Sequence, residues 1–410
     1  MSHNVLYLSY DGMTDPLGQS QVLPYLCGLT KRGFIFHLIS FEKKDRFEKY
    51  ASHIQAICDE NGIVWHPLSY TKKPPLLSTI YDVQRMKKLA HNLNKKFNFS
   101  IVHCRSYLSA LVGLGMKKRF KTKFLFDMRG FWADERVDGN IWNIQQPIFK
   151  WVYRYFKKKE KQFFIHADHT VSLTYAGKEE ICSWKGLGHL RTKIEVIPCC
   201  ADLNKFNPNN IKEERRQYFF QELQLTNNNF ILGYVGSIGT WYMLDEMLEY
   251  FKHLLKEKPN ALFLFVTGED ESTILEKAKK IGISSDKFRV ISVLHQDVAT
   301  CISLFSASIF FIIPTFSKKA SSPTKQGELM AMGIPIICNA GVGDTAKIVE
   351  EYDAGYALEG FSEEYFSRVD INFPYFNESK CKKGAEEFYS LTQGVDRYFS
   401  VYSSLTSHGV

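Results

Sequence analysis

Short apolar runs alternate along the first half of the chain with segments whose apolar residues recur at helical spacing. The runs predict strands and the periodic segments predict helices. The expected strands are residues 4–10, 34–41, 63–68, 100–104, 123–127, 169–174 and 193–200. The expected helices lie at about 19–31, 46–61, 78–96, 147–164 and 176–184. This βαβ rhythm predicts a parallel sheet with helices on both faces.

The same alternation starts again near residue 230, after a polar stretch that begins at 201–210. Further apolar runs lie at 230–235, 261–270, 288–294, 309–314 and 334–338, and helical patterns lie at about 244–256, 272–281, from 297, and 385–405. The sequence therefore predicts an α/β protein with two Rossmann-like domains. The expected boundaries are 1–205, 206–385 and a C-terminal helix over 386–410.

Composition places the chain among globular proteins with reduced thiols. Its 410 residues are 45% hydrophobic and 23% charged, which suits two domains with separate cores. The nine cysteines form no Cys-x-x-Cys pair, and no basic segment followed by an apolar run opens the chain. The longest apolar run, 302–316, is interrupted by polar residues and is shorter than the ~20 residues of a membrane span. We expect a cytoplasmic protein.

Charge is distributed unevenly between the two halves. Residues 1–200 hold 31 Lys and Arg against 17 Asp and Glu, whereas residues 201–410 hold 21 against 27. The first half thus carries a net charge of +14 and the second −6. This asymmetry indicates that the first domain faces an acidic surface or substrate. Nucleic acid is disfavoured as that partner, because no nucleic-acid-binding motif accompanies the charge.

The segment 320–344, ASSPTKQGELMAMGIPIICNAGVGD, contains the strongest candidate for a binding site. Cap-forming residues precede a short helical run that ends at Gly333, and a buried strand then leads to a second Gly-rich turn at 341–344. Helix N-termini at the carboxyl ends of strands favour an anionic ligand. The candidate cap and turn residues are Ser321, Ser322, Pro323 and Thr324.

Two side chains of the helical run add specific chemistry to this anion site. Lys325 can neutralise a phosphate, and Glu328, three residues later on the same helix face, can accept hydrogen bonds from two sugar hydroxyls. The turn GSIGTWY at 236–242 is a second place where a backbone can approach an anion closely. Its candidate binding residues are Gly236, Ser237 and Gly239.

The first half offers further candidates in two turns. Gly18, in the turn after the first strand, is placed where a ligand can approach the start of a helix; alternatively, Pro16 and Gly18 only shape the turn. The segment 127–139 mixes charged residues with aromatics at a strand's carboxyl end, which favours a binding loop. A salt-bridged surface loop is the alternative. The candidates in this segment are Arg129, Asp134 and Glu135.

The expected helix at 147–164 combines an apolar stripe with clustered basic residues. A basic, aromatic, amphipathic helix can lie on an anionic membrane surface. A solvated face is the alternative, since most charge runs are of that kind. The basic run at 117–123 supports membrane contact.

Five segments together resemble the retaining GT-B glycosyltransferases, in particular glycosyltransferase family 4. They are GQSQVLPYL at 18–26, DMRGFW at 127–132, VIPCCADLNKF at 196–206, GYVGSIG at 233–239 and SPTKQGELMAMGIPII at 322–337. The last is the most specific, and the resemblance covers nearly the whole chain. It implies a GT-B fold, in which two Rossmann-like domains face each other across a cleft and the last helix crosses back to the first domain. The N-terminal domain would bind the acceptor and the C-terminal domain the nucleotide-sugar donor.

The resemblance also implies roles for individual residues. Glu328 is similar to the glutamate that binds the donor ribose, and Lys325 and residues 322–324 would lie near the diphosphate. Val293 and Leu294 resemble the segment whose backbone recognises the nucleobase, and Gly18 would lie near the transferred sugar. Ala320 stands where the family often has a first glutamate, and the turn 237–242 lacks the basic pair that often follows GYVG.

By resemblance, the function is transfer of a hexosyl group from a nucleoside-diphosphate sugar, with retention and without a metal or other cofactor, to a glycan or lipid-linked acceptor. The expected setting is surface polysaccharide biosynthesis, at the inner face of the cell membrane. Arg129, Asp134 and Glu135 would contact the acceptor or the sugar. Alternatives are a nucleotide-sugar epimerase or a phosphorylase on the same fold, and a non-catalytic protein that binds sugar nucleotides.

Overall fold

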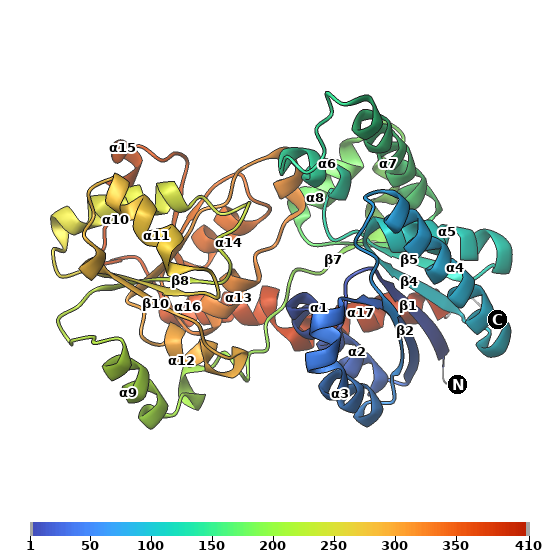
Figure 1. Cartoon of the computed structure of the whole chain (residues 1–410), viewed down its shortest axis with the longest axis horizontal. Helices are drawn as coiled ribbons and strands as arrows, with labels where there is room; N and C mark the ends of the chain where they lie inside the picture. The colour runs from blue at the N-terminus through green and yellow to red at the C-terminus, as the bar shows by residue number, and fades with distance from the viewer. Residues whose placement is uncertain (1–2, 407–410) are drawn as a thin grey trace. The chain divides into compact units, whose positions relative to one another are not determined.

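The computed structural model describes residues 3–406 and divides into two compact units (Figure 1). Unit 1 comprises the chain up to Pro198 together with the terminal segment from Leu391, and unit 2 comprises Cys199–Ser390. These divisions lie a few residues from the boundaries that the sequence predicts. Of the expected terminal helix, residues 407–410 lie outside the described part of the chain.

Unit 1 contains a parallel sheet of seven strands in the order β3-β2-β1-β4-β5-β6-β7. The first strand has neighbours on both sides from later in the chain, as in doubly wound α/β folds. The strands of this sheet are rich in buried β-branched and aromatic residues, which is typical of parallel strands covered on both faces. The strands are β1 His3–Ser9, β2 Phe34–Glu42, β3 Val64–Ser69, β4 Ile101–Arg105, β5 Lys123–Asp127, β6 His169–Ser172 and β7 Ile194–Val196.

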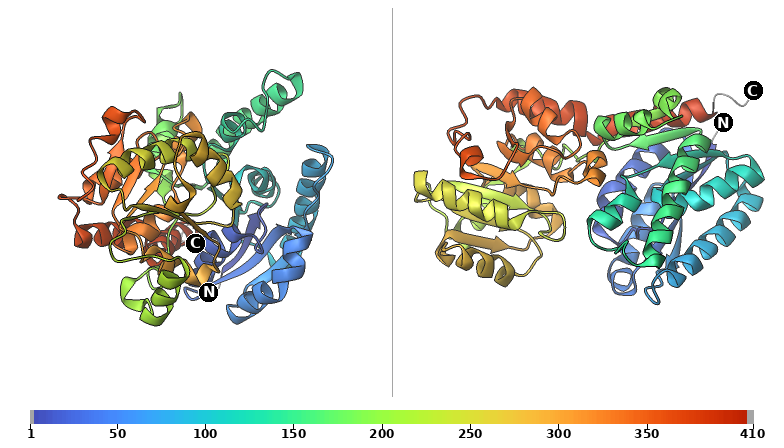
Figure 2. Two further views of the ribbon diagram at one scale, coloured as in Figure 1. Left: turned by 60° about the vertical axis from the view of Figure 1, so that its left-hand side comes forward. Right: turned by 90° about the horizontal axis from the view of Figure 1, so that it is seen from above.

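Helices cover both faces of this sheet (Figures 1 and 2). One group packs α5 against α4, α7 and the strands β4 and β5, and another packs α17 against α2, which lies on β2. The helices are α1 Pro16–Gln21, α2 Leu23–Thr30, α3 Lys44–Glu60, α4 Leu77–Phe97, α5 Ser106–Phe120, α6 Trp132–Asp138, α7 Pro147–His166, α8 Tyr175–Ser183 and α17 Leu391–Thr406, with a 3₁₀ turn η1 Gly188–Lys193.

Unit 2 contains a parallel sheet of six strands in the order β10-β9-β8-β11-β12-β13. It has its own apolar core, in which Phe251, Phe263 and Phe288 pack ring against ring. The strands are β8 Ile231–Val235, β9 Leu262–Val266, β10 Phe288–Ile291, β11 Ala307–Phe310, β12 Ile336–Asn339 and β13 Gly355–Leu358. The two parallel sheets, each with its helices, confirm the prediction of two Rossmann-like domains.

The helices of unit 2 surround this sheet, and α13 lies at the start of the most specific motif. They are α9 Glu213–Glu222, α10 Leu244–Glu257, α11 Glu271–Lys280, α12 Val298–Ile302, α13 Thr324–Ala331, α14 Thr345–Glu351, α15 Glu363–Phe366 and α16 Glu378–Gly384. Shorter turns are η2 Pro208–Asn210, η3 Ser285–Lys287, η4 His295–Asp297, η5 Phe316–Ala320 and the π-helical η6 Ala385–Tyr389.

The sequence pattern missed α5, which connects β4 to β5. Most of its residues up to Met116 are buried, so no polar stripe marks a helical period. The predicted binding loop at 127–139 is wrong in part, because residues 132–138 form α6. The predicted helix at 19–31 is also divided, since the backbone at Val22 (φ −129°, ψ −66°) leaves the helical region before Pro24.

The terminal segment 385–405 is likewise not one helix. Ser390, with φ −64° and ψ 127°, interrupts it between η6 in unit 2 and α17 in unit 1. The segment after this residue therefore returns to the first unit. Within residues 3–406, no helix combines the length and the apolar character that a bilayer-spanning helix requires.

Candidate functional site

Lys325 is a buried cation near the start of α13 that lacks a polar partner. Only 7% of it is exposed, and its Nζ makes no hydrogen bond with any residue that the structure describes. The Nζ lies 3.9 Å and 3.8 Å from the ring centroids of Tyr234 and Tyr242. Aromatic faces stabilise a cation but do not replace hydrogen bonds. The side chain is therefore held in position with its hydrogen-bonding capacity unused.

Burial lowers the pKa of Lys325 well below its ordinary value, and the nearby Glu328 raises it only partly back. An anionic group bound beside the Nζ would favour the charged ammonium and supply the missing hydrogen bonds. The site is thus suited to an anion.

Gly236 brings a backbone turn next to this cation. The residue follows β8 and has φ +106°, a conformation that favours glycine. A Cβ built on Gly236 would lie 3.4 Å from the Lys325 Nζ. A Cβ on Gly239 would meet nothing within 4 Å, so this part of the turn is open. Between them, Ser237 is exposed and its carbonyl accepts a hydrogen bond from the Tyr234 hydroxyl.

Glu328 lies one helical turn after Lys325, and its carboxyl group makes no hydrogen bond with a described residue. Burial raises the pKa of its carboxyl to about 7, although the positive charges of Lys325 and Lys205 act in the opposite direction. A hydrogen-bond donor from a ligand would stabilise the carboxylate form. The structure therefore brings Lys325 and Glu328 together on one helix face, as the sequence predicts, and adds Gly236 beside Lys325.

The aromatic turn that follows β8 receives a second lysine from another element. Lys318, in η5, places its Nζ 3.6 Å from the ring centroid of Trp241. The turn 237–242 has no Lys or Arg of its own, and Lys318 and Lys325 lie against two of its aromatic rings. Ala320, at the end of η5, is completely buried and supplies no carboxylate. Lys318 was missed because its role depends on a contact between η5 and the β8 turn.

The start of α13 differs from the predicted capping pattern. Pro323 occupies the N-cap position, and no side chain caps the helix, so the prediction that Ser321, Ser322 and Thr324 act as caps is wrong. The Ser322 hydroxyl instead accepts a hydrogen bond from the backbone N–H of Cys199 at 3.2 Å. The first N–H groups of α13 are therefore not satisfied by a capping side chain, which is typical of anion sites at helix starts.

The segment after β10 contains Val293 and Leu294, the two residues that are candidates for contact with a nucleobase. Val293 and Leu294 follow the last residue of the strand, and 70% of Leu294 is exposed. His295 starts η4 and contacts the Lys205 Nζ through its Nδ1. Burial lowers the pKa of Lys205, with Glu328 the main opposing influence. Lys205 belongs to the ADLNKF run and is a further cation near Glu328 that the sequence reasoning did not assign.

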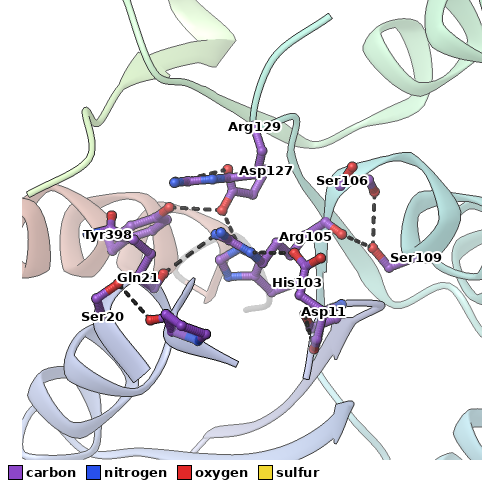
Figure 3. A network of polar contacts seen from close by, with 12 residues as sticks. Asp11, Ser20, Gln21, His103, Arg105, Ser106, Ser109, Asp127, Arg129 and Tyr398 are labelled. Carbon is purple, nitrogen blue, oxygen red and sulfur yellow. Dashed lines mark hydrogen bonds and ion pairs between the residues drawn. The ribbon is translucent and has the colours of Figure 1, made fainter. Parts of the chain in front are cut away.

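In unit 1, a buried polar network surrounds Asp127 at the carboxyl end of β5 (Figure 3). Its Oδ2 accepts a hydrogen bond from the Tyr398 hydroxyl at 3.1 Å and lies 3.5 Å from the His103 Nε2. The Arg129 Nη1 lies 4.0 Å from its Oδ1. Arg129 and the neighbouring charges lower the pKa of Asp127 despite its burial. Arg129 is thus positioned by a carboxylate that the sequence reasoning did not single out.

The other two candidates of this segment lie on α6. Asp134 accepts hydrogen bonds from the Tyr153 hydroxyl at 2.8 Å and the Lys157 Nζ at 2.7 Å, which tie α6 to α7. This favours the salt-bridged alternative for Asp134. Glu135 is half-buried in the first turn of α6.

Gly18 lies in α1, where its lack of a side chain permits close packing. A Cβ at this position would lie 2.3 Å from the Gly12 carbonyl oxygen and 2.6 Å from the Met13 Cα. Because the obstacle is backbone, it cannot move aside as a flexible side chain does. The requirement for glycine is therefore explained by packing within unit 1.

Gly18→Ala should accordingly destabilise unit 1 by about 1–3 kcal/mol. Gly115→Ala is the matched control, since Gly115 is helical in α5 and a Cβ there meets nothing within 4 Å. The control should be neutral or slightly stabilising. Thermal unfolding of both variants tests this expectation, and an unchanged Tm for Gly18→Ala would contradict it.

No group of three or more His, Cys, Asp or Glu residues suited to a metal ion occurs within residues 3–406. The nine cysteines are all free.

Two family models and a set of solved structures match this chain. Residues 20–205 match the model described as Glycosyltransferase Family 4, and residues 215–369 match Glycosyl transferases group 1. A search of curated protein sequences finds no match. A glycosyltransferase from Rickettsia africae has a TM-score of 0.72 and 15% identity, with all of both chains covered. Sucrose-phosphate synthase from Thermosynechococcus elongatus has a TM-score of 0.71 and 14% identity, with 99% of each chain covered.

HepE from Anabaena, in complex with UDP-glucose, has a TM-score of 0.68 and 12% identity over 98% of this chain and 99% of its own. At these identities the solved structures show only that the fold is shared, whereas the matches to the family models show the family. Since the two models together span most of both units, the chain belongs to the group 1 glycosyltransferases, with a first unit of the family 4 type.

Proposed function

We propose that this glycosyltransferase moves a hexosyl group from a nucleoside-diphosphate sugar to a glycan or lipid-linked acceptor, with retention of the anomeric configuration. The surroundings of Lys325 are the main support for a nucleoside-diphosphate sugar as the donor. The buried Nζ of Lys325 has no polar partner among the described residues and lies beside the open Gly236 turn, while Glu328 follows on the same helix face. The complex of HepE with UDP-glucose supports this donor class.

In the proposed mechanism, the diphosphate lies between the Gly236–Gly239 turn and the start of α13. Lys325 and the N–H groups of α13 stabilise the negative charge that grows on the diphosphate as the glycosidic bond breaks. Glu328 accepts hydrogen bonds from the ribose hydroxyls, and the backbone at 293–294 contacts the base. The acceptor hydroxyl attacks from the face that the diphosphate leaves, so the configuration is retained. The proposal requires no metal or other cofactor.

The acceptor side of the proposal rests on unit 1. Arg129, oriented by Asp127, is the candidate for an anionic or hydroxyl group of the acceptor, and Glu135 is the candidate for a sugar hydroxyl. Asp134 acts indirectly, because its partners on α7 hold α6 in place. We further propose that the basic α7 places this unit at an anionic membrane surface, in polysaccharide biosynthesis.

A second candidate is a non-catalytic protein that binds sugar nucleotides. The buried Ala320, in place of a carboxylate, favours it.

A panel of nucleotide sugars should distinguish the two candidates. We expect one donor to raise the Tm of the purified protein, because a ligand that binds only the folded state stabilises it by mass action. The same donor should then release nucleoside diphosphate only when an acceptor extract is present. Stabilisation without acceptor-dependent release in any extract would favour the non-catalytic candidate, and release without acceptor would contradict transfer.

A further inference from the structure

An apolar groove of about 520 Å³ opens between α4 and α7, with α5 beneath it. Leu108 and Leu111 of α5 line its base, and most of its other lining residues are apolar, with Thr79 and Gln84 as exceptions on α4. Several apolar residues at its rim are largely exposed, which is costly in water unless a partner covers them. The exposed fractions are 65% for Leu77, 57% for Ile80, 55% for Ile148 and 66% for Trp151.

The helices around this groove present basic and no acidic side chains to solvent. The only acidic residue of α4 is Asp82, which is buried and bonded to Tyr10 and Thr71. The only acidic residue of α7 is Glu160, which is buried and bonded to Tyr107 and Lys157. The helix α5 has none. The exposed Lys and Arg residues of α4 and α7 are Lys87, Lys88, Lys95, Lys96, Lys150, Arg154, Lys158 and Lys161, and Lys72 and Lys73 are exposed in the loop before α4.

Helical geometry places the apolar and basic rows of α7 next to each other. Ile148, Trp151 and Tyr155 recur three or four residues apart and line the groove. Lys150, Arg154, Lys158 and Lys161 recur at the same spacing along the adjacent exposed stripe. A hydrocarbon-facing row beside a basic row is the arrangement of helices that lie at the boundary between lipid headgroups and acyl chains.

We propose that the groove between α4 and α7 receives a hydrocarbon chain of an anionic membrane phospholipid. Lys150, Arg154 and the other exposed basic residues bind the surrounding headgroups, while Ile80, Ile148 and Trp151 enter the acyl region. This inference rests on the membrane contact proposed above and adds a defined lipid site that includes α4. The charge of the face selects an anionic lipid surface over an uncharged protein partner or a second, equally basic copy of this chain.

Vesicle binding by the full chain tests the groove directly. The probe is vesicles of phosphatidylglycerol and phosphatidylcholine, with sedimentation as the readout. Ile148→Glu should weaken binding about tenfold or more, because the buried contact of one isoleucine is lost. Ile165→Glu is the matched control, with the same charge change on the same helix at a residue that is 53% exposed and does not line the groove. Equal loss in both variants would overturn the proposal and indicate charge attraction alone.

Two further measurements separate a filled groove from surface contact. Thr79→Trp adds apolar bulk inside the groove, so it should weaken vesicle binding although the surface becomes more apolar. Lipids brominated on the acyl chain should quench the tryptophan fluorescence, and Trp151→Phe should remove most of this quenching. Unchanged binding by Thr79→Trp, or quenching that survives in Trp151→Phe, would overturn the proposal. So would concentration-dependent self-association that Ile80→Glu abolishes, because a second copy would then cover the groove.

These experiments can contradict the lipid groove and the donor site separately. Stabilisation by nucleotide sugar is expected to be the same in Ile148→Glu, Thr79→Trp and the wild-type protein, because these residues belong to unit 1. Quenching through Trp151 without donor stabilisation would uphold the groove and contradict the proposed donor. Donor stabilisation without quenching through Trp151 would support the proposed donor and contradict the lipid groove.

Discussion

Lys325→Met is expected to lower kcat/KM for the donor by roughly 10²–10³-fold, the usual effect of removing one group that stabilises charge in a transition state. The same substitution should make the protein more stable. The ammonium is buried without a hydrogen-bond partner among the described residues, and an uncompensated polar group of this kind costs about 1–3 kcal/mol. Lost activity with increased stability identifies a residue kept for function.

Steady-state kinetics and thermal unfolding of the same preparation test this pair of effects. Lys347→Met is the matched control, because Lys347 is an exposed lysine on α14 in the same unit. The control should leave both quantities unchanged. A Lys325→Met protein that is less stable and equally active would show that the side chain has a structural role, and would contradict the assignment.

Glu328→Gln is expected to weaken donor binding by about 1.5–3 kcal/mol, or roughly 10–100-fold, because a hydrogen bond to a charged acceptor is replaced by one to a neutral amide. Calorimetric titration with the donor measures the affinity. The matched control is Glu350→Gln, an exposed carboxylate on α14. Unchanged affinity in Glu328→Gln would exclude this carboxylate from the donor site.

The pH dependence of binding provides a second readout for Glu328. Burial raises the pKa of its carboxyl to about 7 in the free protein. Hydrogen bonds from ribose hydroxyls favour the carboxylate, so they lower this pKa in the complex. Donor affinity attributable to Glu328 should therefore be present above pH 7 and fall as pH decreases through this value. Glu328→Gln should lack this loss on the acidic side, whereas the contribution of Lys325 to the pH profile should remain.

The alternation of apolar runs was sufficient to predict the seven strands of the first sheet and five of the six strands of the second, whereas β13 was missed. The pattern does not predict a helix whose residues show no alternation between buried and exposed positions. The helix α5 is buried on nearly all sides and carries no amphipathic period, so its sequence does not distinguish it from a connection. The charged and aromatic residues of α6 favour a binding loop in the sequence, which does not show that Asp134 bonds to Tyr153 and Lys157 of α7.

The sequence predicts those parts of the candidate site whose residues are close together in the chain. Lys325 and Glu328 share a helix face, and their spacing alone brings them together. Lys318 and Lys205 reach the same region from other elements, and Asp127, the neighbour of Arg129, accepts a hydrogen bond from Tyr398 at the end of the chain. Such contacts depend on the packing of distant segments. The glycine at position 18, in contrast, was expected near the ligand and is explained by close packing on Gly12.

We propose above that unit 2 binds the donor diphosphate beside Lys325. A crystal structure of the protein with the stabilising nucleotide sugar, or its nucleoside diphosphate, tests it most directly. We expect diphosphate oxygens within hydrogen-bond distance of the Lys325 Nζ and of the first N–H groups of α13, with the ribose hydroxyls bound to the Glu328 carboxylate. A nucleotide bound elsewhere, with the Lys325 Nζ still without a hydrogen-bond partner, would contradict this prediction.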